Sequence, residues 1–289
     1  DDTGAVLFAQ NAHVLLPPAS LTKILTAVVT LERTYLSQPV RVRAEWDELY
    51  DSSIMGLTAG EVLSVEELLY GLMLPSGNDA ALALARAIAG SEEGFVRLMN
   101  AKMRALGLAG SHFRNSHGLH DETHYTTAYE IATVARYGLR NPVFAKIVAT
   151  PQLTVRGGGV YPLRNTNRML RTYRGTYGVK TGYTEEALMT LVAAAERDGR
   201  RVVTAVLGST NTFADAERLL DFTFDGGPLL AGGGPGRAAG LRGFGPPRMF
   251  GPWQTPEWPR WWVSAHDRRA FEIEFALLYR TSRAASIAR

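Results

Sequence analysis

Cysteine is absent from the 289 residues of this chain. Its absence excludes disulfide bonds, thiolate catalysis and zinc held by cysteine. The chain also lacks any apolar run of 18 residues, so we expect no membrane-spanning helix. Charge is nearly balanced up to residue 225, with 22 Lys and Arg against 24 Asp and Glu, whereas residues 226–289 carry 9 against 4. Because the basic excess lies in the last segment, the composition argues against a nucleic-acid-binding protein.

Lysine is scarce, with four residues against 27 arginines. Two of the four are Lys23, in an S-x-x-K motif that begins at Ser20, and Lys180, which opens a K-T-G motif. An arginine side chain stays protonated and cannot act as a base, whereas a lysine can lose its proton when it is buried or placed near another cation. The use of lysine at these two positions therefore predicts chemistry there.

Ser20 and Lys23 lie at the head of an apolar run, directly after two prolines. Prolines before such a run are typical of a helix start, so we predict a helix over residues 20–34. Positions i and i+3 share one helix face, which brings the Lys23 amine within reach of the Ser20 hydroxyl, and the helix dipole favours an alkoxide at Ser20. An isolated S-x-x-K is more often an N-capping serine followed by a surface lysine, so other motifs have to decide.

A second motif, S-x-N, interrupts two predicted helices over residues 65–74 and 79–89. Gly77 and the proline at position 75 predict a short loop there, which presents the side chains of Ser76 and Asn78 between the helices. Taken alone, this segment is an ordinary turn.

The K-T-G motif falls in the first of three strands that we predict between residues 177 and 208. The second and third strands are apolar and are joined by an R-D-G-R turn at 197–200. A glycine at position 182 lets a substrate backbone approach the first strand closely. The alternative interpretation of Lys180 is a lysine that ends an ordinary strand.

In the order S-x-x-K, S-x-N and K-T-G, these motifs form a set that occurs in β-lactamases and penicillin-binding proteins. The sequence around them resembles the D-alanyl-D-alanine carboxypeptidases, which are low-molecular-mass penicillin-binding proteins of peptidase family S11. The resemblance covers about residues 1–225. The matching stretches are 18–24, 76–80 and 180–184, with further likeness at 2–7, 112–119 and 124–128.

The resemblance implies a role for each motif residue. Ser20 attacks the peptide carbonyl and forms an acyl-enzyme, and Lys23 takes its proton. The charge of Lys180 helps to keep the Lys23 amine neutral. By the same resemblance, Ser76 relays a proton to the leaving D-alanine, and Asn78 positions Lys23 and the substrate amide. Lys180 and Thr181, beside Gly182, bind the terminal carboxylate. The backbone N–H groups of Ser20 and Tyr183 form an oxyanion hole.

The implied function is removal of the terminal D-alanine from peptidoglycan stem pentapeptides, with β-lactam antibiotics as covalent inhibitors. The resemblance implies no metal and no cofactor, and the partner is a stem peptide ending in D-Ala-D-Ala rather than a nucleic acid. The family acts in the periplasm or on the outer face of the cytoplasmic membrane. We therefore expect an exported protein, and we expect that a signal peptide and the first strand of the fold precede residue 1.

Two other functions fit parts of the pattern. A class A β-lactamase shares the first two motifs, but it needs a Glu-x-x-Leu-Asn loop to activate the deacylating water, and no such pattern lies between the second and third motifs. A catalytically silent peptidoglycan-binding protein is the other alternative, although every nominal catalytic residue is present. The sequence departs from the family at residues 185–188, where we expect a small Ala-Gly pair, and this departure concerns substrate preference more than chemistry.

A histidine cluster offers a competing metal site. Four of the six histidines, at positions 112, 117, 120 and 124, fall in one short segment. Residues 120–124 read H-D-E-T-H, close to the zinc-protease motif H-E-x-x-H. However, the acid after the first histidine is Asp121, and the segment follows a predicted loop rather than lying on a helix. We interpret it as a structural loop beside the active site.

The coarse pattern predicts the α+β class, with a β-lactamase/DD-peptidase-like fold over residues 1–225. An antiparallel sheet flanked by helices would carry an all-helical lobe, with the catalytic cleft between them. The predicted elements are a strand at 4–9, helices at 20–34, 65–74, 79–89, 92–106, 126–139 and 212–222, and the three strands between 177 and 208.

Residues 226–289 form a C-terminal extension that matches nothing in the family. The extension holds four of the five tryptophans and half of the prolines, and it includes a Gly-rich run at 232–245. We favour a poorly ordered extension because of its Gly and Pro content. The alternative is a peripheral membrane contact through its tryptophans and arginines. Residues 271–275 alternate like one strand.

Overall fold

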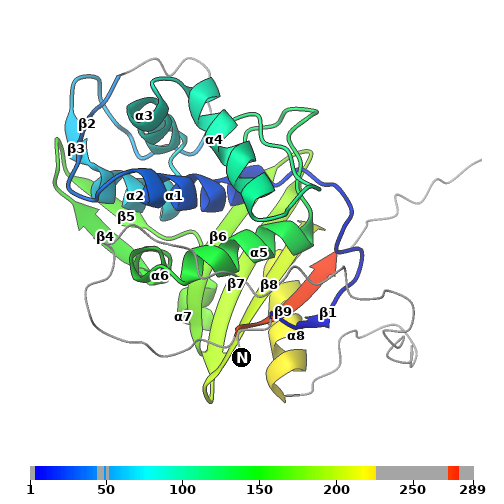
Figure 1. Cartoon of the computed structure of the whole chain (residues 1–289). Helices are drawn as coiled ribbons and strands as arrows, with labels where there is room; N and C mark the ends of the chain where they lie inside the picture. Colours follow the sequence, from blue (N-terminus) through cyan, green and yellow to red (C-terminus); the bar gives the residue numbers. More distant parts are fainter. Residues whose placement is uncertain (1–3, 44–48, 50–51, 226–272, 280–289) are drawn as a thin grey trace, which may run out of the picture.

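A five-stranded sheet forms the centre of the structure, a computed structural model that describes residues 4–43, 49, 52–225 and 273–279 (Figure 1). The strand order is β1-β9-β8-β7-β6. Helices cover the sheet, and the predicted α+β class is confirmed. The strands are β1 (Val6–Phe8), β6 (Thr176–Thr184), β7 (Leu188–Arg197), β8 (Arg200–Ser209) and β9 (Ile273–Tyr279).

The three longest strands, β6, β7 and β8, form the antiparallel meander that the sequence predicted. Asp198 and Gly199 join β7 to β8, with φ angles of 52° and 77°. A two-residue turn with positive φ at both positions matches the twist of the flanking strands, and Asp-Gly is a preferred pair for it. The R-D-G-R segment therefore fixes this hairpin by local conformation.

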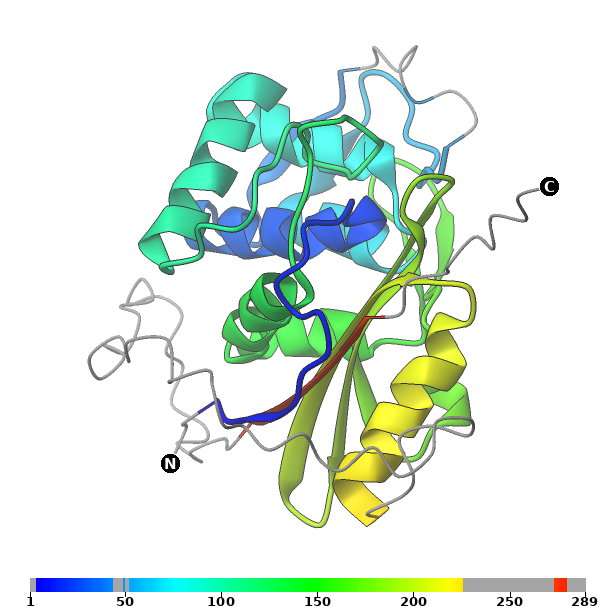
Figure 2. The same cartoon turned by 90° about the vertical axis from the view of Figure 1, so that its right-hand side faces the viewer.

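Both faces of the meander are buried, and successive side chains point to opposite faces. Leu191, Ala193 and Ala195 of β7 pack in a small core with α8 (Thr212–Asp225). Val192 and Ala194, between them, belong to the larger core of the molecule. Figure 2 shows α8 on one side of the sheet and α5 (Ala128–Leu139) on the other. Burial on both faces explains why the strand sequence is continuously apolar instead of alternating.

A helical lobe lies above the sheet in Figure 1. Ser64 and Glu67 begin α2 with a capping box, and Ser91 caps α4. These local signals made the helices predictable, and their bounds agree with the predicted ranges within one or two residues. The lobe contains α1 (Thr22–Arg33), α2 (Val65–Met73), α3 (Asn78–Ala89) and α4 (Glu92–Ala105).

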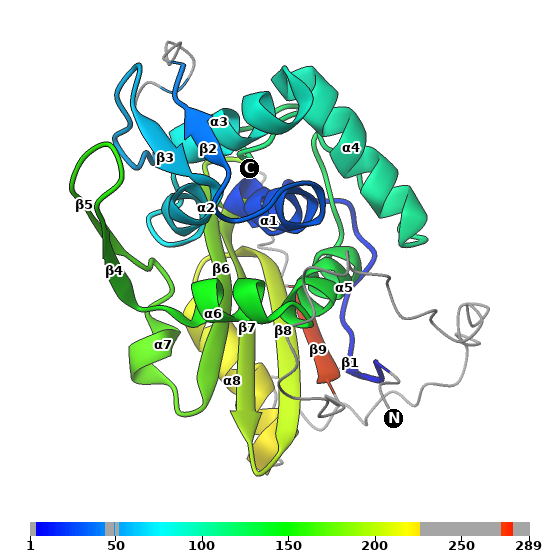
Figure 3. The ribbon, with the colours of Figure 1, turned by 60° about the vertical axis from the view of Figure 1, so that its left-hand side comes forward.

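Six short elements were not predicted from the sequence. Two hairpins lie beside α2 in Figure 3. Their strands have three or four residues, which is too short for a period of two to appear in the sequence. The second of these hairpins spans residues 152–164. The six elements are β2 (Pro39–Arg41), β3 (Val62–Ser64), β4 (Gln152–Val155), β5 (Tyr161–Arg164), α6 (Pro142–Ala149) and α7 (Met169–Thr172).

Strand β9 lies between β1 and β8 and runs parallel to both, which makes the sheet mixed. The alternating sequence at 271–275 predicted a strand, and β9 begins at Ile273. The rest of the extension, including its four tryptophans, lies outside the described residues, so its expected poor order and membrane contact stay predictions. In the described part of the chain, no helix has the length and apolar character needed to cross a membrane.

Substitution of Gly199 tests the backbone conformation of the β7–β8 turn, because nothing lies within 4 Å of the position that a Cβ would take. Backbone conformation is then the main cost of a side chain. We expect Gly199→Val to lower the free energy of unfolding by about 1–2 kcal/mol. Gly199→Asn should cost less, since asparagine adopts positive φ more readily. Denaturant unfolding of both variants measures the difference, and equal losses would contradict this explanation.

Candidate active site

Ser20 lies in the middle of a single 3₁₀ turn, η1 (Ala19–Leu21), directly before α1. The α-helix predicted from residue 20 therefore starts two residues later. The Thr190 hydroxyl of β7 donates to the Pro18 carbonyl at 3.1 Å. Gly118 packs so closely on the Ala19 carbonyl that a Cβ would not fit. Sheet and loop together thus hold the backbone of Ser20 in place.

The Lys23 amine is buried and makes three close polar contacts. Its Nζ lies 2.9 Å from Ser20 Oγ, 2.6 Å from Asn78 Oδ1 and 2.6 Å from the His117 carbonyl oxygen. The predicted meeting of Ser20 with Lys23 is therefore present in the fold, and α3 and the loop after α4 supply the other two contacts. The loop contact with His117 could not be found from motif spacing.

Burial lowers the pKa of Lys23 well below the ordinary lysine value, and repulsion from Lys180 lowers it further. The Asp79 carboxylate acts in the opposite direction. A neutral amine has two N–H groups and one lone pair. The amide oxygen of Asn78 and the carbonyl of His117 can only accept, so they take the two N–H groups and the lone pair faces Ser20 Oγ. The amine is thereby oriented as a base toward the serine hydroxyl.

Lys180 is the second buried lysine of the site, with 1% of its surface exposed. It projects from β6, and its Nζ donates to the Thr181 carbonyl at 2.9 Å. Burial lowers its pKa to about 7. Both motif lysines are therefore buried, which is a condition under which a lysine can lose its proton.

Ser76 lies in the loop between α2 and α3, as the second motif predicted, whereas Asn78, predicted for the same loop, already belongs to α3. Asn78 is the first residue of α3, which aims its amide at Lys23. Ser76 has a φ of 69°, and its buried hydroxyl has no hydrogen-bond partner among the described residues. A buried hydroxyl without a partner is costly, so this one is available to a substrate group.

The K-T-G strand runs beside the nucleophile turn. A Cβ on Gly182 would lie 2.8 Å from the Ser20 backbone nitrogen. Glycine is therefore required here by the approach of η1 to the strand, a protein contact in addition to the expected substrate approach. Thr181 Oγ1 lies 2.6 Å from Thr166 Oγ1. Tyr183 follows with 65% of its surface exposed.

Asp79 is a site residue to which the sequence interpretation gave no role. Its carboxylate accepts backbone N–H groups from Met55, Gly56 and Leu57 at 2.8, 2.8 and 3.0 Å, and from Ala80 at 2.8 Å. It thereby ties the segment before β3 to the start of α3. An acid in the first turn of a helix was the available signal, but the distant segment that it binds was not visible in the sequence.

The clustered histidine side chains make separate contacts. His124 Nε2 lies 2.9 Å from Thr22 Oγ1, and His117 Nδ1 accepts the Leu119 N–H at 3.1 Å. Burial lowers the pKa of both histidines to about 3, which keeps them neutral. Across the described ranges, no group of three or more His, Asp and Glu side chains is placed to hold a metal ion.

Residues 185–187 form the turn from β6 to β7, where the sequence departs from the family pattern. Leu188, the next residue, has a φ of 54°, a conformation that favours glycine. The Glu186 carboxylate lies 4.0 Å from His120 Nδ1. An exposed acid therefore stands near the histidine loop at this end of the strand.

Comparison with known proteins explains this arrangement. The sequence model of D-alanyl-D-alanine carboxypeptidases, peptidase family S11, matches residues 1–211. The chain belongs to this family. It is 38% identical over 233 residues to D-alanyl-D-alanine carboxypeptidase DacF of Bacillus subtilis, an alignment that covers 77% of this chain and 60% of DacF. It is 35% identical to DacB2 of Mycobacterium tuberculosis, over 77% of this chain and 79% of that protein.

The fold agrees with this membership. A serine-to-alanine mutant of the Streptomyces K15 DD-transpeptidase superposes with a TM-score of 0.71 at 32% sequence identity, covering 75% of this chain and 92% of that chain. The predicted β-lactamase/DD-peptidase-like fold is confirmed. The chain spans less than two thirds of the length of DacF.

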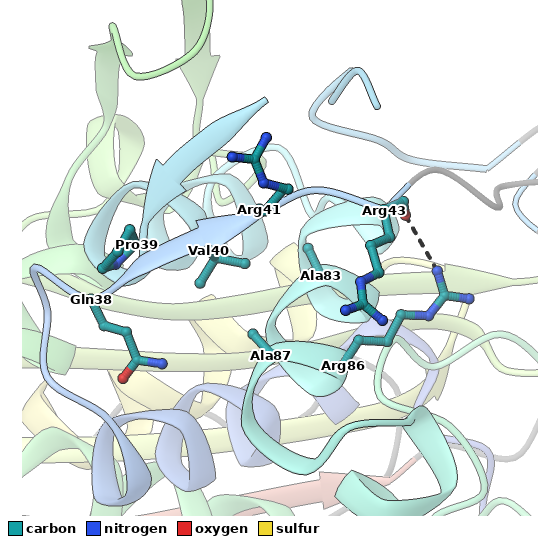
Figure 4. A pocket seen from close by; sticks show the side chains of 8 residues that line it. All are labelled: Gln38, Pro39, Val40, Arg41, Arg43, Ala83, Arg86 and Ala87. Carbon is teal, nitrogen blue, oxygen red and sulfur yellow. Dashed lines mark hydrogen bonds between the residues drawn. The ribbon is translucent and has the colours of Figure 1, made fainter. Parts of the chain in front are cut away.

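A pocket of about 270 Å³ lies apart from the site, between β2 and α3 (Figure 4). Ala83, Arg86 and Ala87 form the α3 wall, and residues 38–41 with Arg43 form the other. Arg86 Nη1 donates to the Arg43 carbonyl at 3.4 Å. No motif residue lines this pocket, so it belongs to the packing of β2 on α3.

Lys180→Met tests the electrostatic coupling of the two lysines. Without the repulsion from Lys180, Lys23 keeps its proton to a higher pH, so the acid limb of the acylation rate should move to higher pH. Stopped-flow acylation by benzylpenicillin across pH measures the limb. Lys146→Met, which removes a lysine with a 69% exposed side chain, should leave it in place. An unchanged limb in Lys180→Met would contradict the coupling.

Asp79→Asn tests the carboxylate anchor. An amide can accept fewer of the four backbone N–H groups and places an NH₂ group against donors. We expect a loss of about 3 kcal/mol in the free energy of unfolding. Asp198→Asn, in the β7–β8 turn, is the matched control and should change it by less than about 0.5 kcal/mol. Similar unfolding curves for both variants would argue against the anchor.

Proposed function

We propose that this chain is a serine-type D-alanyl-D-alanine carboxypeptidase that removes the terminal D-alanine from peptidoglycan stem pentapeptides. The observation that carries the proposal is the buried Lys23 amine, 2.9 Å from Ser20 Oγ, with its other two contacts made by acceptors. Such an amine can take the serine proton, which an ordinary surface lysine cannot do at neutral pH.

Acylation begins when Ser20 Oγ attacks the carbonyl of the penultimate D-alanine and its proton passes to Lys23 Nζ. A bond forms between Oγ and the carbonyl carbon, and negative charge develops on the carbonyl oxygen. The backbone N–H groups of Ser20 and Tyr183 stabilise that charge. The closeness of Gly182 to the Ser20 nitrogen supports this pairing, because it brings β6 beside the nucleophile turn.

Collapse of this intermediate breaks the bond to the terminal D-alanine, whose nitrogen needs a proton. The hydroxyl of Ser76, buried and without a partner among the described residues, supplies a relay from Lys23. Lys180 and Thr181 bind the terminal carboxylate, which a protonated Lys180 would favour. Asn78 orients Lys23 and the substrate amide. Water then attacks the ester carbonyl, breaks its bond to Oγ and releases a peptide shortened by one residue.

The proposed partners follow from this chemistry. A stem peptide ending in D-Ala-D-Ala is the substrate, and β-lactams acylate the same serine as covalent inhibitors. Peptidoglycan lies outside the cytoplasmic membrane, so we place the protein in the periplasm or at the outer face of that membrane. Residues 1–225 are the catalytic domain in this proposal, and residues 226–289 are an extension that contributes β9 to the central sheet.

Intact-mass spectrometry with benzylpenicillin tests the proposal. We expect a lasting adduct that maps to Ser20 and none in Ser20→Ala, because the attacking oxygen is gone. Lys23→Arg should lower acylation by at least about 100-fold, since it keeps the charge but loses the base. Release of D-alanine from a pentapeptide should be lost in both variants.

Each alternative function gives a different result. An adduct that disappears while the drug is hydrolysed indicates a β-lactamase. The absence of an adduct in protein shown to be folded by circular dichroism indicates a silent binding protein. A labelled adduct in Ser20→Ala, or normal turnover in Lys23→Arg, would overturn the residue assignments.

A further inference from the structure

The direction of the Lys23 lone pair depends on the His117 carbonyl, one of the two acceptors that hold the amine. This carbonyl belongs to the segment between α4 and α5, beside the start of α1 (Figure 1). His117 has no helical or strand hydrogen bonds of its own, since the segment forms only two isolated bridges, His112 with Tyr125 and Thr126 with Leu16. Other contacts must therefore fix the orientation of its peptide group.

The Gly118 N–H, in the same peptide unit as the His117 carbonyl, donates to Asn115 Oδ1 at 2.6 Å. Glu92, at the start of α4, makes the charged contact with the residue before His117. Its Oε1 accepts the Ser116 backbone N–H at 2.7 Å and the Ser116 hydroxyl at 2.6 Å. The same oxygen lies 3.6 Å from His117 Nε2. Hydrogen bonds to a carboxylate are shorter and stronger than those between neutral groups. One carboxylate oxygen thus grips two consecutive residues of the loop.

The protonation of His117 agrees with this contact. Its Nδ1 accepts the Leu119 N–H, so the ring proton of the neutral imidazole lies on Nε2, the nitrogen nearest to Glu92. On the opposite side, the Thr26 hydroxyl of α1 donates to the Ser116 carbonyl at 2.6 Å. Ser116, the residue directly before the one that carries the Lys23 acceptor, is therefore clamped between α4 and α1.

We propose that Glu92 is a positioning residue for the Ser20 reaction, acting on Lys23 through the Ser116–His117 backbone. It touches neither the substrate nor the reacting atoms. It keeps the His117 carbonyl where it takes one Lys23 N–H, so that the lone pair stays directed at Ser20 and water stays away from the amine. This inference rests on the proposed function, because it requires Lys23 to act as the base.

Glu93 offers a matched control on the same helix turn. Both acids lie in the first turn of α4 and experience the same helix dipole. Burial contributes little to the pKa of Glu93, which is lowered mainly by local hydrogen bonds, including one from Ser91. Replacement of Glu93 therefore reproduces the loss of helix-end charge without loss of the loop contact.

The experiment compares Glu92→Ala, Glu92→Gln and Glu93→Ala by single-turnover acylation with benzylpenicillin across pH, with Tm measured in parallel. We expect Glu92→Ala to slow acylation by about 10- to 100-fold, since small displacements of a catalytic group cost this much. Its acid limb should move to higher pH, because water beside Lys23 relieves the burial that keeps its pKa low. Glu92→Gln keeps an acceptor oxygen and should recover most of the rate, and Glu93→Ala should match the unaltered chain.

The possible outcomes separate this inference from the proposed function. If the unaltered chain is never acylated, the proposed function fails first. If the unaltered chain and folded Glu92→Ala react equally fast, only the role of Glu92 fails. A smaller reactive fraction or lower Tm with an unmoved acid limb would show a purely structural role and overturn the inference. If Glu92→Ala does not fold, the inference still fails if Glu92→Gln is acylated much more slowly than the unaltered chain. A clear loss of acylation rate in Glu93→Ala would overturn it as well.

Discussion

The desolvated Lys23 amine is the constraint on which the rest of the site depends. An uncharged lysine costs little to bury, but its two N–H groups still need acceptors, and a charged one would be strongly disfavoured in the same place. Asn78 and the His117 carbonyl satisfy the N–H groups and leave the lone pair for Ser20. Burial therefore lowers the pKa of the Lys23 amine, and the two acceptors in the buried site fix the direction of its lone pair. Lys180, buried nearby, adds repulsion that keeps the amine neutral.

Four separate parts of the chain have to meet around this amine, and each is held by its own local device. Helix α1 places Lys23 one turn from Ser20. The Asp79 carboxylate ties the start of α3 to the segment at residues 55–57. Glu92 and Thr26 clamp the loop that carries His117. Gly182 allows β6 to lie against the nucleophile turn. The side chains of the site are thus held in place mostly through contacts with backbone groups, whose positions depend on the packing of both lobes.

The sequence predicted the long elements because their signals are local. Capping residues, apolar runs and the Asp-Gly turn belong to segments of nine to fourteen residues, which are long enough for a period or a cap to appear. The hairpins β2–β3 and β4–β5 escaped because strands of three or four residues carry no readable period. The start of α1 was predicted two residues early, since a proline signal cannot distinguish a 3₁₀ turn from the first turn of an α-helix.

Residue type and spacing were sufficient to identify the motif residues and their order, because a nucleophile, its neighbouring base and a second lysine are recognisable from them. Spacing also predicted that Ser20 and Lys23 share a helix face, a relation of only three positions. The tertiary structure decided which atoms complete the site. The His117 carbonyl and the anchors Asp79 and Glu92 act through backbone groups distant in the chain, and a backbone carbonyl or N–H is the same in every residue. No pattern of side chains can specify which of them will meet, so packing alone selects them.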